Sequence, residues 1–230
     1  MRSVERDVLL LLLASCAGCA DGWSYLGLGH AFVANMTGNT VLLGIAVFQN
    51  HGDLLHPALS LGCYGIGAVL GSFLNRNVHP ETYWSKTISW SLMLEGLLLA
   101  GAEAGWITHH AHGWPNLNLL QGVVALAIGI QSAAMVQLNI PGIVTTYITG
   151  TWTTMLAGLV RLSRQKRDQP PPQYLEFEHR LRMQAAVLSA YFLSAVLTGW
   201  LFRHLPSAVG ALPATAVLLV AIHGLLRADS

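Results

Sequence analysis

The sequence predicts an all-α integral membrane protein, and the scarcity of charge is the main reason. Charged residues make up 10% of the 230 residues, whereas a soluble globular chain carries about 25%. Hydrophobic residues reach 53%, the mean hydropathy is +0.50, and no charged residue lies between Glu103 and Arg161. Lipid is therefore the solvent for most of the chain. A soluble enzyme, a disordered tail and a nucleic-acid binder, which would need a basic face, are excluded.

Eight apolar segments follow one another along the chain, most of them near the ~20 residues that a membrane helix needs. They cover residues 8–28, 30–48, 57–75, 88–106, 118–138, 141–160, 183–202 and 207–227. The apolar runs are continuous rather than alternating, which excludes a β-barrel. Pro57, Pro141 and Pro206 stand at segment starts, where a helix tolerates proline. We expect helices in a single membrane domain over residues 1–230.

The two halves of the chain resemble each other. Three stretches of the first half align on three of the second: Tyr64–Arg76 on Tyr191–Arg203, Thr37-Gly38 on Thr149-Gly150, and Glu95–Leu98 on His223–Leu226. This predicts two sequence repeats of four apolar segments each, with repeat one over 8–106 and repeat two over 118–160 plus 183–227. The polar stretch 161–182, which contains three consecutive prolines, is predicted to be a cytoplasmic linker.

The positions of the 12 lysines and arginines favour six full spans plus two broken or re-entrant segments over eight full spans. If all eight segments cross and the N-terminus is inside, nine of these residues are inside. If segments 30–48 and 141–160 enter and leave on the same side, only Arg203 is outside. Each half then crosses an odd number of times, so the halves face opposite ways, as in many transporters. We expect a multi-pass protein of the bacterial plasma (inner) membrane with both termini cytoplasmic.

The stretches Phe32–Thr40 and Val144–Thr151 each place a Thr-Gly pair and several amide or hydroxyl groups near mid-membrane. Two broken segments that meet there would form a polar site from backbone dipoles and short side chains. Simple packing of small residues is the alternative. The predicted solute-binding residues are Asp21, Asn35, Thr37, Gly38, Asn39, Gln131, Thr149 and Gly150.

Three ionisable side chains lie inside apolar runs: Asp21, Glu95 and His223. A charge at the bilayer centre costs at least ~2.5 kcal/mol, so such residues usually face the protein interior and often act in function. We predict all three as candidates for proton coupling. Glu95 and His223 occupy equivalent repeat positions, which predicts a pair across a pseudo-two-fold axis. A purely structural hydrogen bond is the alternative.

Other motifs carry less weight. Cys16 and Cys19 have C-x-x-C spacing but lie in an apolar run, so small buried side chains are favoured over a redox or metal role. The histidines 109, 110 and 112 are predicted to lie in a solvated loop, with a metal site as the alternative. We expect no metal, no cofactor and no enzymatic activity. Gly67 and Gly71 are predicted to be a helix contact motif.

The run Asn35-Met36-Thr37-Gly38-Asn39, with Ala17–Asp21 before it, resembles the YoaK family of bacterial inner-membrane proteins. The second half agrees at Gly129–Ala133 and Thr145–Thr151. That family is a domain of unknown function with about six membrane spans. The resemblance implies membership and location, and it brings no established substrate.

These observations together favour a small-solute transporter or channel whose polar midplane site is formed by both repeats. Its partners would be the lipid bilayer and an unknown small solute, with no nucleic acid and a possible homo-oligomer. A non-transporting scaffold or sensor that signals through residues 161–182 is the first alternative. An intramembrane enzyme that uses Asp21 or His223 is the second.

Overall fold

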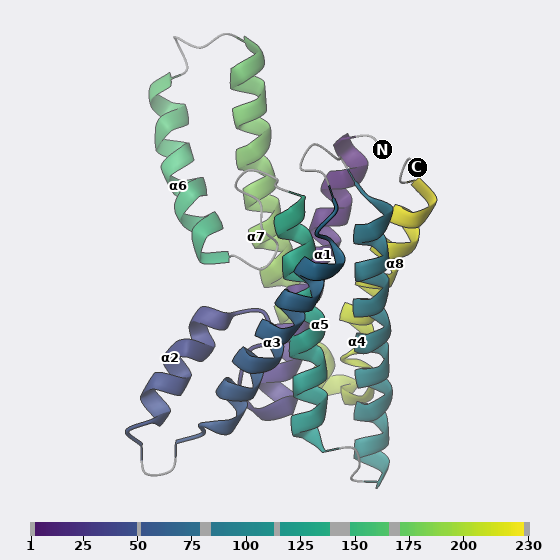
Figure 1. Ribbon diagram of the computed structural model, residues 1–230. Coiled ribbons are helices and arrows are strands. Elements are labelled where there is room, and N and C mark those ends of the chain that lie inside the picture. The colour runs from purple at the N-terminus through teal and green to yellow at the C-terminus, as the bar shows by residue number, and fades with distance from the viewer. Residues whose placement is uncertain are drawn as a thin grey trace.

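The computed structural model describes residues 3–49, 52–78, 84–112, 116–138, 148–165 and 171–227, which confirm the all-α fold class (Figure 1). The helices are α1 Ser3–Trp23, α2 Met36–Ala46, α3 Leu55–Leu74, α4 Lys86–His112, α5 Leu117–Gln137, α6 Ile148–Gln165, α7 Pro171–His204 and α8 Ala211–Arg227. A π-helical segment, η1 Ser24–Gly29, extends α1, and a 3-10 turn, η2 Pro206–Ala208, precedes α8.

Within the described ranges, five helices are long and apolar enough to cross a membrane. They are Val4–Gly29, Leu55–Leu74, Leu117–Gln137, Tyr174–His204 and Pro206–Arg227. The 27-residue α4 is equally long and packs against α5 and α8, but its two glutamates and its terminal histidines lower its hydropathy. By contrast, α2 has 11 residues, about 16 Å of helix, which is half of a bilayer core.

The short helix α2 belongs to a segment that returns to the side from which it came (Figure 1). The chain leaves η1 at the end opposite the two termini, turns back to mid-depth, and then runs as α2 towards that same end, where α3 begins. Helix α6 also begins near mid-depth and runs the other way, towards the end that holds the termini. Both helices therefore start near the middle of the molecule and run towards opposite ends (Figure 1).

The helix contacts of the first half are repeated in the second, if α1 to α4 are taken as the counterparts of α5 to α8. Helix α1 packs along α7 and α5 along α3, while α2 packs on α3 and α6 on α7. Helices α4 and α8 contact each other, and α1 contacts α8 as α5 contacts α4. Counterpart helices run in opposite directions (Figure 1). An inverted repeat produces this pattern, and the duplication itself stays a prediction from the sequence.

The contact between α3 and α5 brings two backbones together. A Cβ atom added at Gly67 would meet the carbonyl of Leu126, and one added at Gly129 would meet the carbonyl of Tyr64. At Gly71 the added atom would lie 2.9 Å from the side chain of Ala133. Small residues permit this close approach, so the predicted contact motif at Gly67 and Gly71 is confirmed.

The polar stretch 161–182 is more helical than a linker would be. Helix α6 continues to Gln165 and α7 begins at Pro171, so every described residue of this stretch is helical. The stretch contains Leu162, Phe177 and Leu181, which pack in one small apolar cluster between α6 and α7. This apolar contact extends both helices into a sequence that is otherwise charged.

Most of the basic residues that the structure describes lie towards one end of the molecule. The two termini lie at this end (Figure 1), Arg76 follows the end of α3, and Lys86 opens α4. Arg203, in the last turn of α7, lies at the opposite end. Arg203 is thus on the other end from Arg76 and Lys86, as expected from the count with six full spans.

Candidate functional site

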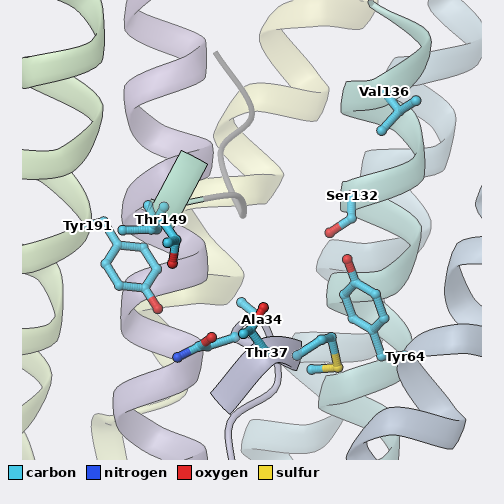
Figure 2. Close-up of a pocket in the computed structure, with 10 residues that line it drawn as sticks. Ala34, Thr37, Tyr64, Ser132, Val136, Thr149 and Tyr191 are labelled. Atoms are coloured by element: carbon cyan, nitrogen blue, oxygen red, sulfur yellow. The ribbon is translucent and has the colours of Figure 1, made fainter. Parts of the chain in front are cut away.

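A cavity of about 400 Å³ lies at mid-depth between the starts of α2 and α6 (Figure 2). Five helices and the turn before α2 contribute to its wall. The lining residues are Ala34, Asn35, Met36, Thr37, Tyr64, Ser132, Val136, Ile148, Thr149 and Tyr191. Side chains that can form hydrogen bonds thus surround a space in the part of the molecule where lipid would otherwise require apolar groups.

The turn that leads into α2 is held by local hydrogen bonds. Gly29 has φ +136° and His30 has φ 55°, and these positive values let the chain reverse after η1. The Ser24 hydroxyl donates to the carbonyl of Ala31 at 2.8 Å. Non-helical backbone at this depth must have internal partners, because lipid supplies none.

Asn39 closes the same turn from the helix side. Its amide nitrogen donates to the carbonyl of Phe32 at 2.6 Å, and its Oδ1 accepts from the Phe32 N–H at 2.9 Å. Asn39 is fully buried. We therefore assign it a structural role in the turn rather than direct contact with a solute.

Asp21 anchors the start of α2 from behind the cavity wall. Its Oδ1 accepts from the N–H groups of Val33 at 2.7 Å, Ala34 at 2.6 Å and Asn35 at 3.4 Å. The hydroxyl of Tyr191 donates to its Oδ2. The side chain is 3% exposed. One carboxyl group thus joins α1, the turn and α7 at the start of α2.

The first turn of α2 points donors towards the cavity. The Asn35 Oδ1 caps the helix by accepting from the Gly38 N–H at 3.1 Å, which leaves the amide NH₂ of Asn35 available. In the described part of the chain, the N–H of Thr37 has no hydrogen-bond partner. Because Thr37 lines the cavity, this end of the helix can bind an acceptor there.

The remaining walls bring two tyrosines to opposite sides (Figure 2). Tyr64 extends from α3 with its hydroxyl towards Ser132 of α5, and Tyr191 of α7 lies across the cavity beside Thr149. The sequence alignment starts at these same two tyrosines, yet neither was predicted as a site residue. Their matching positions in the two repeats were the signal that could have identified them.

The structure divides the eight predicted binding residues into three groups. On the cavity wall it places Asn35, Thr37 and Thr149. In the first turns of the two short helices it places Gly38 and Gly150. Behind the wall it places Asp21, Asn39 and Gln131, of which Gln131 donates to the carbonyl of Leu13 at 3.1 Å and so links α5 to α1. Residues 144–147 of the second predicted polar stretch lie outside the described residues.

The other two predicted proton-coupling residues lie away from the cavity. Glu95 is fully buried and accepts a weak hydrogen bond from the Cys16 thiol, with 3.7 Å between Sγ and Oε1. His223 is half-buried and faces a groove beside the first turns of α1. Over the described ranges no hydrogen bond joins Glu95 to His223, so the expected pair is not seen. Their part in proton coupling stays a prediction.

Glu103 is a further buried carboxyl group, with 7% of its surface exposed. Its Oε2 accepts from the Gly210 N–H at 3.0 Å, one residue before α8 begins. Nearby, the indole N–H of Trp106 donates to the carbonyl of Pro206 at 2.7 Å. Glu103 therefore accepts a main-chain hydrogen bond at the start of α8, as Asp21 does just before α2.

A second hollow, of about 510 Å³, lies at the end opposite the termini. It is lined by residues from η1, the starts of α3 and α5, and the end of α4, among them His30, His56 and His109. The predicted histidine loop is in fact the last turn of α4, which continues to His112. In the parts of the chain that are described, no group of three or more His, Cys, Asp or Glu could hold a metal ion.

The comparisons with known proteins agree with this architecture. The family described as "Protein of unknown function (DUF1275)" matches residues 9–223. The UPF0700 transmembrane protein YoaK of Bacillus subtilis (strain 168) is 32% identical over 165 residues, which cover 70% of this chain and 72% of that protein. No solved structure matches. This multi-pass membrane protein therefore belongs to the DUF1275 family, which confirms the resemblance noted in its sequence.

Proposed function

We propose that this protein is a membrane transporter that moves a small polar solute through the cavity between the starts of α2 and α6. The observation that carries the proposal is the cavity itself: hydroxyl and amide groups line a space at mid-depth, where α2 and α6 begin. Transporters built from inverted halves place their solute sites at such helix breaks. Irregular backbone at this depth is tolerated where it is buried in protein or lines a cavity.

The closed side of the cavity favours a carrier over an open channel. Residues 26–30 line the second hollow and residues 34–37 line the cavity. The chain between them includes Ala31 and Val33, which are fully buried, and the adjoining Leu28 is fully buried as well. The described residues therefore close this side of the cavity, and a solute can cross only if one wall of the cavity moves relative to the other.

Blocking the cavity tests the proposed function. The purified protein is reconstituted in liposomes, and the entry of small radiolabelled amides, polyols, carboxylates and amines is measured against protein-free vesicles. Thr149→Trp should abolish protein-dependent entry, because the indole would fill the space. Thr215→Trp, on the exposed face of α8, is the matched control and should retain entry. The proposal fails if no solute enters faster than in protein-free vesicles, or if Thr149→Trp transports normally.

Among the three ionisable candidates, Asp21 is the one connected to the cavity, since Tyr191 both lines the space and donates to Asp21. If protons drive transport, Asp21→Asn should remove the dependence of uptake on an imposed pH gradient. Glu95→Gln and His223→Gln should leave that dependence in place. Loss of the dependence in either of these two variants would reassign the coupling site.

We also propose that the end holding the termini is cytoplasmic, because most of the described basic residues lie towards it and positively charged loops stay inside. Reporter fusions at Lys86 and at Gln49 test this orientation. Lys86 should report a cytoplasmic position and Gln49 an external one. The reverse result at both sites would invert the protein in the membrane.

A further inference from the structure

We infer that the cavity takes an uncharged solute that carries both a hydrogen-bond donor and an acceptor, of the amide or polyol class, and does not take an ion. The inference rests on the proposed function and specifies its substrate class. It depends on three features of the described wall: the charge of its side chains, the occupation of the nearby carboxylate, and the direction of its hydrogen bonds.

The first feature is the charge of the wall. The described lining residues are apolar or carry hydroxyl and amide groups, and none of them is an acid, a lysine, an arginine or a histidine. An ion at the bilayer centre costs at least ~2.5 kcal/mol and needs a partner of opposite charge to offset the loss of water. The wall offers no such partner, whereas a neutral polar molecule needs hydrogen bonds alone.

The second feature is the state of Asp21, the carboxylate that lies behind the wall. Its two oxygens already accept from three main-chain N–H groups and from the hydroxyl of Tyr191. A cation in the cavity would therefore compete with these donors for the carboxylate. An anion gains little from the turn before α2, because Asp21 already accepts from the N–H groups of residues 33–35 there. Both kinds of ion are disfavoured by the same contact.

The third feature is the direction of the hydrogen bonds around the space. Tyr191 gives its proton to Asp21, so its oxygen presents lone pairs to a solute. The N–H of Thr37 and the hydroxyl of Tyr64 have no partner among the described residues and can donate. A solute that donates to some groups and accepts from others fits these walls.

Pairs of molecules with the same shape and different charge test this inference. Urea is compared with guanidinium, and methanesulfonamide with methanesulfonate, because the second member of each pair stays charged at neutral pH; glycerol represents the polyols. Entry into liposomes that contain the full chain is measured at zero membrane potential. We expect protein-dependent entry for at least one neutral molecule and for neither ion, and imposing a potential should not change the rate.

Two tyrosine variants connect the flux to the cavity. Tyr64→Phe should reduce neutral-solute entry about fivefold, the equivalent of one lost hydrogen bond of ~1 kcal/mol. Tyr25→Phe is the matched control, because Tyr25 is exposed on η1 and stacks on Phe32 without lining the cavity. Equal rates in the two variants would overturn the inference. Gel filtration confirms that each variant remains folded.

The outcomes separate the inference from the proposed function. Entry of an ion without entry of any neutral molecule would overturn the substrate class but would still support the proposed transport function. No protein-dependent entry of any of the five molecules would overturn the substrate class, and the wider solute panel with Thr149→Trp would then decide the proposed function. Entry of a neutral molecule that Thr149→Trp abolishes would support both.

Discussion

The starts of α2 and α6 face the same cavity, but the fold holds them differently. The turn before α2 is fixed by directional hydrogen bonds to Asp21 and Asn39, which are both buried. Helix α6, as described from Ile148, packs on α7 through a small apolar cluster and a hydrogen bond from the Gln184 amide to the Thr154 hydroxyl at 3.0 Å. Segments with few buried contacts open at lower free energy than segments in the core. The comparison predicts that the first half forms the more rigid wall of the cavity, here called the fixed wall, and that the second half forms the wall that opens more easily, here called the moving wall.

The largest expected effect comes from removing the anchor of the fixed wall. Asp21→Ala leaves three N–H groups and the Tyr191 hydroxyl without their acceptor. A buried donor left without an acceptor costs roughly 1–3 kcal/mol. We expect a clear fall in the unfolding temperature of the detergent-solubilised protein, measured by tryptophan fluorescence.

The conservative variant Asp21→Asn sharpens this test. It keeps an acceptor for the turn and removes the negative charge, so the loss should be about half as large. A double-mutant cycle with Tyr191→Phe should give a coupling energy of roughly 1 kcal/mol or more. Additive losses would show that the two side chains do not stabilise each other and would weaken the contrast between the two walls.

Asp21 shows which part of the site could be predicted from the sequence and which part could not. A carboxylate in an apolar run must face the protein interior, and that much was predictable. Its partners were not, because they are main-chain N–H groups of residues 33–35, whose position depends on the turn formed after Gly29. Residue type gives no information about where a main-chain donor will point.

The fold was more predictable than the site. The apolar segments predicted the helices. The lysine and arginine positions favoured two segments that do not cross fully, and the short helix α2 lies in one of them. Helix ends were less predictable: α7 begins at Pro171 within a charged stretch, because Leu181 and Phe177 pack against α6. The polarity of the sequence alone cannot predict this contact between α6 and α7.

The next largest effect is expected at the contact between α3 and α5, which supports the fixed wall. In Gly67→Ala the new methyl group would meet the Leu126 carbonyl, and the helices would have to separate. Overpacking of this kind costs about 1–3 kcal/mol. Gly65→Ala is the matched control, since an added Cβ atom meets nothing within 4 Å there. Equal unfolding temperatures for the two variants would contradict the close backbone contact.

A smaller and more local effect is expected at the moving wall. Leu181→Ala removes a buried side chain from the cluster between α6 and α7, and we expect a loss of about 2 kcal/mol, at the low end of such truncations. Hydrogen exchange should increase in α6 and α7 while α2 and α3 stay protected. An increase spread evenly over all helices would remove the distinction between the two walls.

The smallest effect concerns the connection from α2 to α3, where Asp53 contacts His56 at 2.6 Å and His56 also contacts Asn118 of α5 at 3.0 Å. Partial burial opposes ionisation of Asp53, but hydrogen bonds from the N–H and ring of His56 outweigh it, so the pKa of Asp53 lies below its ordinary value.

A carboxyl group whose pKa is lowered by folding stabilises the protein above its unfolded pKa, near pH 4, and that stabilisation disappears as the pH falls through the lower, folded value. Because Asp53 is half exposed, we expect only about 0.5 kcal/mol. The unfolding temperature of Asp53→Asn should therefore lie slightly below that of the wild type at pH 7, and the two should converge at the most acidic pH that the fold tolerates. A gap that stays constant with pH would show that the charge of Asp53 does not stabilise the contact between the starts of α3 and α5.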